Sequence, residues 1–385
     1  MNKKGAFPGC LFLIYVVSYG VQAIYSTYLN LFLKGEGLNE GKIGLIASVS
    51  AAVALAGQLL WGVLSDRAKV KNHILQLLYF GAAVTGLFFY AGAGFYFFLM
   101  MGIVFTIFYE PTATLQDNLA LEILEDGPYD FGKIRLGGTA GYCVTVLLVG
   151  YFLDNHYRNI FFLISGALFL CAAIFLKLKP VYGQGGKKAD KGSFKNLVFN
   201  KHLMAMIGIQ MMFRIGNVYF SSFYPIHLTE TGGTSSNVGL IVFVCALSEI
   251  PIYYLIYHVV ERWGEDKVLI GAGIVTGLRW MILSKAQSMP FILLVSLFHG
   301  IGFTAFSYCV LYTINTSVPK NIRATSQMMN AILLSLTSKV LFGYLNGLAS
   351  EKFGISQMVG VYGVLMMAAT ALYFAFVIYS KKRTV

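Results

Sequence analysis

The sequence predicts an all-α membrane protein of about twelve transmembrane helices, arranged as two pseudo-symmetric bundles of six. The composition, the spacing of the apolar runs and the distribution of basic residues all point to this fold class. Hydrophobic residues make up 57% of the 385 positions and charged residues only 12%, whereas a soluble domain is roughly a quarter charged. Because a bilayer core needs roughly 20 apolar residues per helix, a chain of this length has room for about a dozen spans.

Apolar runs separated by short polar breaks mark the expected spans. They lie at roughly 8–33, 41–64, 73–92, 95–120, 133–153, 159–178, 202–228, 237–260, 267–286, 290–316, 324–349 and 356–380. The first run follows Lys3 and Lys4 as a signal peptide would, but it is too long for one and lacks a convincing cleavage site. The one long break, residues 180–200, is rich in glycine and lysine. It predicts a flexible linker between an N-terminal bundle, residues 1–179, and a C-terminal bundle, residues 201–385.

The basic residues test this segmentation, because Lys and Arg gather in the cytoplasmic loops of membrane proteins. Most of the 29 basic residues fall at the two termini and in alternate loops. The opposite loops hold only Lys34, Lys42, Arg158, Lys285 and Lys352. The pattern predicts a multi-pass protein of the bacterial plasma membrane, with both termini and the linker in the cytoplasm. It also accounts for the net charge of +12 without a nucleic-acid partner.

The sequence carries no motif for a cofactor, a metal site or an enzyme active site. The five cysteines lie in apolar runs without C-x-x-C spacing, so neither a disulfide framework nor a metal site is expected. The patterns H-E-x-x-H, G-x-S-x-G and G-x-x-x-x-G-K-[ST] are absent. We therefore expect a solute transporter rather than an enzyme. Its partners would be a small-molecule substrate, protons and the lipid bilayer, and it is expected to act as a monomer.

A faint internal repeat relates the two halves. Residues 62–67 follow span 2, and residues 259–264 follow span 8 half a chain later. Parallel repeats of this kind are typical of transporters whose two bundles surround a cavity at the midplane. The first copy resembles the signature of the major facilitator superfamily, although Ala68 and Lys69 stand where that signature has a glycine. The matching positions are Gly62, Asp66, Arg67, Lys69 and Lys71. The resemblance implies that Gly62, Asp66 and Arg67 form a conformational-switch loop.

Other segments give a narrower resemblance. Residues 129–138 are similar to the start of span 5 in lactose permease, the nucleoside:proton symporters and the phenylpropionate permease group. Residues 248–250, 278–280 and 299–303 are similar to the phenylpropionate permease group. Together they imply the major facilitator fold and a proton-coupled symporter that imports a small organic solute by alternating access. The solute would be a nucleoside, a sugar or an aromatic acid. A proton-coupled exporter or drug antiporter of the same fold remains the alternative.

Ionisable residues inside the spans are candidates for function, because each costs at least about 2.5–3.5 kcal/mol to insert. Two helix faces combine such residues with polar neighbours at i, i+4, i+7 spacing: Glu110, Thr114 and Asp117 in span 4, and Arg135, Thr139 and Tyr142 in span 5. Asp117 and Arg135 are expected to form an ion pair. The resemblance to lactose permease and the nucleoside symporters implies substrate binding by these faces. A purely structural salt bridge or a cytoplasmic loop latch is the alternative.

Two more polar stripes on otherwise apolar helices are expected to face water and substrate. They comprise Tyr15, Tyr19, Gln22 and Ser26 in span 1, and Gln210, Arg214, Asn217 and Ser221 in span 7. Tyr19 and Gln22 are candidates to stack on and hydrogen-bond a flat ligand. Gln210, Arg214 and Asn217 are candidates on the opposite half. Phe303 joins the substrate-binding candidates through the resemblance of residues 299–303.

Glu249, near the middle of span 8, is the candidate proton site, together with Arg279 and His299. Burial favours the neutral form of a carboxyl group and a nearby cation favours its charged form, so Glu249 can alternate between the two. A permanently charged structural pair with Arg279 or Lys339 is the alternative. The spans also hold one more positive than negative charge, which an anionic substrate could balance.

Overall fold

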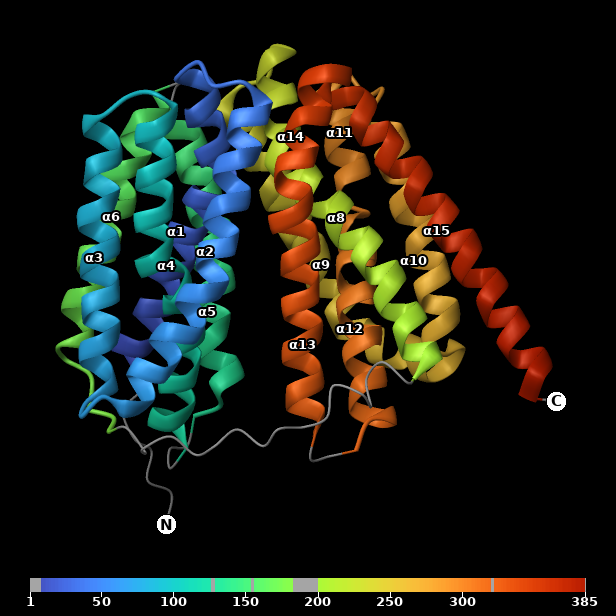
Figure 1. Ribbon diagram of the computed structural model, residues 1–385, viewed down its shortest axis with the longest axis horizontal. Helices are drawn as coiled ribbons and strands as arrows, with labels where there is room; N and C mark the ends of the chain where they lie inside the picture. Colours follow the sequence, from blue (N-terminus) through green and yellow to red (C-terminus); the bar gives the residue numbers. More distant parts are fainter. Residues whose placement is uncertain (1–7, 126–128, 154–155, 183–199, 320–321, 385) are drawn as a thin grey trace. The chain divides into compact units, whose positions relative to one another are not determined.

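The computed structural model describes residues 8–125, 129–153, 156–182, 200–319 and 322–384, and these are helical almost throughout (Figure 1). No strand occurs within these ranges, where the one β-bridge joins Val70 and Tyr182. The all-α fold class predicted from the sequence is confirmed.

The chain divides into two compact units. The first comprises residues 1–189 with 234–239, and the second comprises residues 190–233 with 240–385. Residues 234–239 belong to the first unit, whereas the expected C-terminal bundle, residues 201–385, included them. Most of the expected linker, residues 183–199, lies outside the described residues.

The first unit contains six long helices. They are α1 (Gly9–Gly35), α2 (Glu40–Arg67), α3 (Lys71–Ala91), α4 (Phe95–Leu124), α5 (Phe131–Phe152) and α6 (Ile160–Phe175). A short 3₁₀ turn, Tyr157–Asn159, precedes α6. Within this unit α1 packs along α5, α2 along α4, and α3 along α6.

The second unit repeats this plan with more interruptions. Its helices are α8 (Lys201–Glu230), α9 (Ser235–Trp263), α10 (Glu265–Leu283), α11 (Met289–Ser296), α12 (His299–Ser317), α13 (Arg323–Ser335), α14 (Phe342–Phe353) and α15 (Ile355–Thr384). A π-helical segment, Leu336–Leu341, joins α13 to α14. Here α10 packs along α15, α8 along α15, and α10 along α12.

The helices account for the predicted spans. Eleven stretches of the described chain are long and apolar enough to cross a membrane, with α11 and α12 forming one of them and α13 to α14 another. The remaining helix, α10, has four charged residues within its 19 positions: Glu265, Asp266, Lys267 and Arg279. Together with α10, the eleven stretches correspond one to one to the twelve predicted spans.

Short polar and glycine-containing junctions set the ends of the helices. The Asn39 side chain accepts a 3.0 Å hydrogen bond from the Lys42 amide at the start of α2, and Asp130 accepts a 2.7 Å bond from the Gly132 amide at the start of α5. Such caps satisfy amides that have no partner within the helix. Gly264, between α9 and α10, has a φ of 80°, which other residues adopt at a cost.

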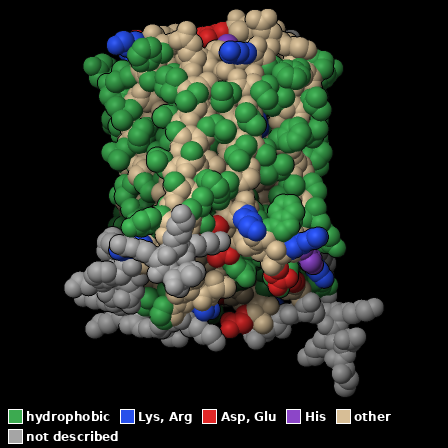
Figure 2. Space-filling view, turned by 90° about the vertical axis from the view of Figure 1, so that its right-hand side faces the viewer, with side chains coloured by type: hydrophobic (Ala, Val, Ile, Leu, Met, Phe, Trp, Pro, Cys, Tyr) green, Lys and Arg blue, Asp and Glu red, His purple; other side chains and the backbone are tan. Residues whose placement is uncertain are grey.

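Many large apolar side chains are exposed on the described part of the protein. Figure 2 shows hydrophobic side chains over the flank of the molecule, with the charged side chains gathered toward its two ends. Large apolar residues that are more than half exposed include Leu59, Tyr254 and Leu372. Because a soluble protein rarely exposes so large an apolar area, this surface fits a lipid environment.

Candidate functional site

In the first unit, Asp117 on α4 is the centre of a polar group that involves three helices. The Tyr15 hydroxyl on α1 donates a 2.6 Å hydrogen bond to Asp117 Oδ1. Arg135 on α5 lies on the other side, with Nε 3.9 Å from Asp117 Oδ2. That separation is too long for a hydrogen bond, so the expected pair is a loose ion pair. Tyr15 is the direct partner of the carboxylate.

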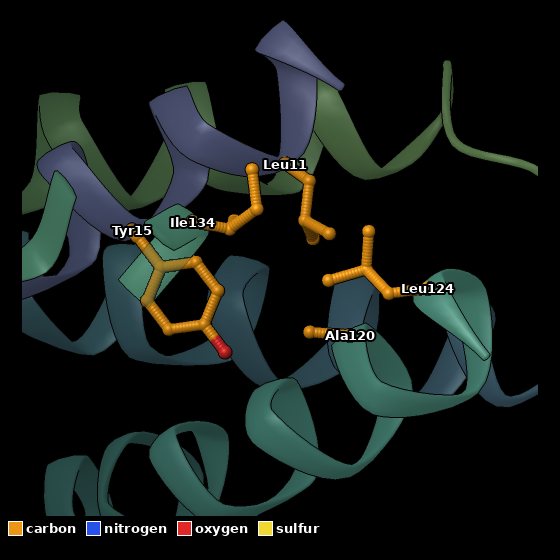
Figure 3. Close-up of a cluster of buried hydrophobic side chains, with 5 residues drawn as sticks. All are labelled: Leu11, Tyr15, Ala120, Leu124 and Ile134. Atoms are coloured by element: carbon orange, nitrogen blue, oxygen red, sulfur yellow. The ribbon is translucent and has the colours of Figure 1, made fainter. Parts of the chain in front are cut away.

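Tyr15 is held in place by an apolar cluster. Figure 3 shows its ring at one side of four other buried side chains, with its hydroxyl turned away from Leu11 and Ile134. The cluster contains Leu11, Tyr15, Ala120, Leu124 and Ile134, drawn from α1, α4 and α5. Burial of the ring against these residues fixes the hydroxyl, so the hydrogen bond to Asp117 is pre-organised.

Arg135 also contacts an aromatic ring. Its guanidinium lies 5.3 Å from the centroid of the Tyr19 ring, a cation–π geometry. This contact depends on the close approach of α1 and α5. A Cβ on Gly138 would lie 2.9 Å from the Tyr19 ring, and a Cβ on Gly141 would lie 2.1 Å from the Val16 carbonyl oxygen. Glycine at these positions therefore lets α5 carry Arg135 to Tyr19.

The remaining candidates of this unit surround the Asp117 group less directly. Tyr142 is half-buried and shares a 3.4 Å hydrogen bond with Ser26, and Thr139 is half-buried one turn earlier. Gln22 is exposed. Glu110 is half-buried and makes no hydrogen bond or ion pair with any residue that the structure describes. The structure therefore brings Asp117, Arg135 and Tyr19 close together, and leaves Glu110 outside this group.

In the second unit, Glu249 on α9 faces His299 at the start of α12. Glu249 Oε1 and His299 Nε2 are 3.7 Å apart, and both side chains are largely buried. His299 in turn stacks on Phe303, with ring centroids 5.8 Å apart. Three residues that the sequence assigned to proton coupling or substrate binding thus lie together.

A close contact between α9 and α12 creates this arrangement. The Gly300 amide donates a 2.9 Å hydrogen bond to Ser248 Oγ. A Cβ on Gly300 would lie only 2.2 Å from the Ser248 carbonyl oxygen. Ser248 directly precedes Glu249, and Gly300 directly follows His299. The contact between Ser248 and Gly300 therefore places Glu249 beside His299.

Arg279 on α10 does not pair with Glu249. It is 3% exposed, and its Nη2 lies 3.7 Å from the Cys245 thiol. Its guanidinium lies 4.7 Å from the centroid of the Phe220 ring, while Nε has no hydrogen-bond partner among the described residues. Cys245 is one helical turn before Glu249 on α9. Arg279 is therefore near the proton-site candidates without forming an ion pair with either of them in the described structure.

The second unit also contains a partly open cavity of about 290 Å³. Its lining comes from α8, α12, α13 and the π segment: Gln210, Phe213, Arg214, Phe306, Ser307, Ala331, Leu334, Ser335, Ser338 and Lys339. Gln210 donates a 3.0 Å hydrogen bond to the Phe306 carbonyl oxygen and accepts a 3.2 Å bond from Asn330. Gln210 and Arg214 were predicted to face such a space. Asn217 is buried and lies outside the lining.

The residues expected to form a switch loop are helical. Gly62, Asp66 and Arg67 belong to the last turns of α2, which continues to Arg67. Asp66 and Arg67 are exposed. A Cβ on Gly62 would meet no atom of its own unit within 4 Å. The second copy of the repeat is similarly placed, since α9 continues to Trp263.

Several residues around these groups were not singled out as candidates from the sequence. Cys245, Phe220, Phe213, Phe306, Ser335 and Ser338 all contact the candidate residues or line the cavity. Each is apolar or small, so single-helix patterns class it as packing. Among the described residues, no group of His, Cys, Asp or Glu is arranged to hold a metal ion.

Comparisons with known proteins agree with the fold. A family model described as "MFS_1 like family" matches residues 10–361. The maltose permease of Geobacillus stearothermophilus is 25% identical over 300 residues, covering 77% of this chain and 75% of the relative. The probable 3-phenylpropionic acid transporter of Escherichia coli (strain K12) is 24% identical over 296 residues, covering 75% and 76%. The crystal structure of the nucleoside transporter NupG superposes with a TM-score of 0.83 at 14% identity, covering 95% of this chain and 98% of that one.

Proposed function

Because this chain belongs to the MFS_1 like family, within the major facilitator superfamily of membrane transporters, we propose that it is a proton-coupled symporter that imports a small organic solute. The relatives named above transport, by their descriptions, a sugar, an aromatic acid or a nucleoside. The solute proposed here belongs to one of these classes. The alternating opening of one site to the two sides of the membrane is the proposed mechanism.

The observation that carries the proposal is the contact between Glu249 and His299. Both groups can take up and release a proton, they come from different helices, and their polar atoms lie 3.7 Å apart within the membrane-spanning part of the chain. Protonation of His299 strengthens its attraction to an ionised Glu249, and protonation of Glu249 removes that attraction. The contact between α9 and α12 therefore changes with proton occupancy. This is the property that coupling requires.

The buried charge of Arg279 supports the same role. A guanidinium without a carboxylate partner favours the ionised form of any nearby carboxyl group. Arg279 is held by the Cys245 thiol and the Phe220 ring, one turn along α9 from Glu249. We propose that it eases release of the proton from Glu249 after the solute has been delivered.

The Asp117 group is proposed as a solute-binding element of the first unit. Asp117 accepts a hydrogen bond from Tyr15 and leaves its second oxygen toward Arg135. Because the two groups are 3.9 Å apart, the guanidinium keeps N–H donors that can bind a polar group of a solute. Tyr19, beneath the guanidinium, and Tyr142, next to Ser26, offer aromatic faces.

Uptake by the purified protein in proteoliposomes tests the proposal. Radiolabelled nucleosides, maltose and aromatic acids are supplied outside, with and without an inwardly directed proton gradient. We expect one class to accumulate above its external concentration only with the gradient, together with alkalinisation of the external medium. Gradient-driven loss of preloaded solute would instead support the exporter or drug antiporter. Equilibration unaffected by the gradient would remove proton coupling.

The proposed orientation places both termini on the cytoplasmic side of a bacterial plasma membrane, as the distribution of basic residues indicates. The proposed functional state is a monomer.

A further inference from the structure

The lining of the cavity in the second unit carries positively charged side chains. Two cations, Arg214 and Lys339, line it together with three serines and Gln210, and the lining contains no Asp or Glu. A positive charge inside a membrane-spanning region is costly unless an anion or water compensates it. The lining therefore favours a negatively charged occupant.

Arg214 is the residue on which this inference mainly rests. It is half-buried on α8, and it makes no hydrogen bond or ion pair with any residue that the structure describes. Among the described residues of this unit, Glu249 is the one acidic residue that lies away from a helix end. Its carboxylate faces His299 rather than Arg214. The planar guanidinium has five N–H donors whose geometry matches a carboxylate. Its donors are thus available to an anion that enters the cavity.

The backbone around Lys339 departs from a regular α-helix. Lys339 and Ser338 lie on the π-helical segment Leu336–Leu341, and π segments occur frequently at functional sites. The Ser338 hydroxyl donates a 2.6 Å hydrogen bond to the Leu334 carbonyl oxygen, and the Thr337 hydroxyl donates a 2.7 Å bond to the Leu333 carbonyl oxygen. Both bonds are accepted by backbone oxygens of residues that lie just before the π-helical segment. They support a conformation that brings Lys339 to the cavity.

The rest of the wall suits an apolar body. Phe213 and Phe306 stack on each other with centroids 4.6 Å apart, and Ala331 and Leu334 complete this side. The cavity is partly open, with a volume of about 290 Å³.

We propose that the transported solute is a small monocarboxylic acid with an aromatic or aliphatic body, and that its carboxylate binds between Arg214 and Lys339. The inference rests on the proposed function, and it narrows the substrate to organic acids. The ring or chain lies against Phe213 and Phe306. Gln210, which is fixed by the Phe306 carbonyl and Asn330, borders the carboxylate.

Equilibrium binding to the purified protein in detergent tests the assignment without any gradient. The probes are 3-phenylpropionate, its uncharged amide, a nucleoside, maltose and inorganic phosphate, with thermal shift and calorimetry as readouts. We expect 3-phenylpropionate to raise the melting temperature and the amide, the nucleoside and maltose to have no effect. Equal binding of acid and amide, or binding of phosphate alone, would overturn the proposal.

Charge-removing variants with matched controls locate the site. Arg214→Gln and Lys339→Gln should each weaken binding of the acid by about tenfold or more, since each loses a charge-assisted hydrogen bond. Arg214→Lys and Lys339→Arg keep the charge and should retain measurable binding. Arg262→Gln and Lys352→Gln remove the same charges at exposed positions outside the cavity and should bind normally. Size-exclusion profiles show whether each variant is folded.

The two proposals fail in different ways. If the acid binds in an Arg214-dependent manner but is not accumulated with a proton gradient, proton-driven import is wrong and the anion site stands. If a sugar or nucleoside accumulates with the gradient and Arg214→Gln transports it normally, the symporter stands and the anion site is wrong.

Discussion

The Tyr15 hydroxyl donates a 2.6 Å hydrogen bond to Asp117 Oδ1, whereas Arg135 Nε lies 3.9 Å from the other carboxylate oxygen. The aspartate is thus fixed by a neutral donor and only loosely associated with the cation. A structural salt bridge would favour the reverse, with the two charges in direct contact. This geometry leaves Arg135 able to bind a solute.

Replacement of either charged residue tests this interpretation. We expect Asp117→Ala and Arg135→Ala each to abolish solute uptake in proteoliposomes while the protein stays folded. The double exchange Asp117→Arg with Arg135→Asp should remain inactive, because a swap preserves a salt bridge but not contacts to a solute. Recovery of transport by the exchange would support a structural pair, and normal uptake by both alanine variants would exclude both roles.

Removal of the Tyr15 hydroxyl should weaken solute binding through Asp117. Tyr15→Phe keeps the buried ring and loses one hydrogen bond to a charged group, worth about 1.5–3 kcal/mol. We expect KM for the transported solute to rise by about tenfold or more, with a smaller change in maximal rate. Tyr254→Phe is the matched control, since Tyr254 is 82% exposed. An unchanged KM for Tyr15→Phe would show that the hydrogen bond does not position Asp117 for the solute.

Glu249→Gln should separate exchange from accumulation. Glutamine keeps the size of the side chain and mimics the protonated carboxyl group permanently, so binding and solute-for-solute exchange should persist. Gradient-driven accumulation should be lost, because the group can no longer release a proton. Counterflow and uptake measurements in the same proteoliposomes check both expectations. Normal accumulation by the variant would remove Glu249 from the mechanism and direct attention to Glu110 or His299.

The contact between α1 and α5 should not tolerate a side chain at Gly141. A Cβ there would lie 2.1 Å from the Val16 carbonyl oxygen, and relief requires the two backbones to separate. We expect Gly141→Ala to cost roughly 1–3 kcal/mol of stability and to lower the melting temperature. Gly166→Ala on α6 is the control, because a Cβ at that position would meet nothing within 4 Å. Equal melting temperatures for the two variants would contradict the close packing of α1 and α5.

The proposed orientation can be checked by cysteine labelling. Cysteines introduced between residues 180 and 200 should react with a membrane-impermeant reagent only after the cells are opened. Cysteines at His156 and Lys285 should react in intact cells. Labelling of the 180–200 segment from outside would invert the proposed orientation.

The helical spans of this protein could be predicted from the amino-acid sequence, because the bilayer imposes strong rules on a chain. Each span needs an apolar run of sufficient length and must satisfy its own backbone groups, so the apolar runs, tested against the positions of the basic residues, located the twelve spans. The short turn between spans 4 and 5 also placed Asp117 near Arg135, and the i, i+4, i+7 rule placed Gln210 with Arg214 on one face. These relationships depend on one helix, or on two helices joined by a short turn.

Tertiary structure alone decided which partner each polar group has. Glu249 lies beside His299, and Arg279 beside Cys245 and Phe220, although the sequence allowed Glu249 to pair with Arg279 or Lys339. The choice depends on the rotation and approach of α9, α10 and α12. Contacts such as that between Gly300 and Ser248 set this approach. The π segment that brings Lys339 to the cavity is equally invisible in the sequence. Its geometry departs from the regular helical period, whereas every sequence pattern assumes that period.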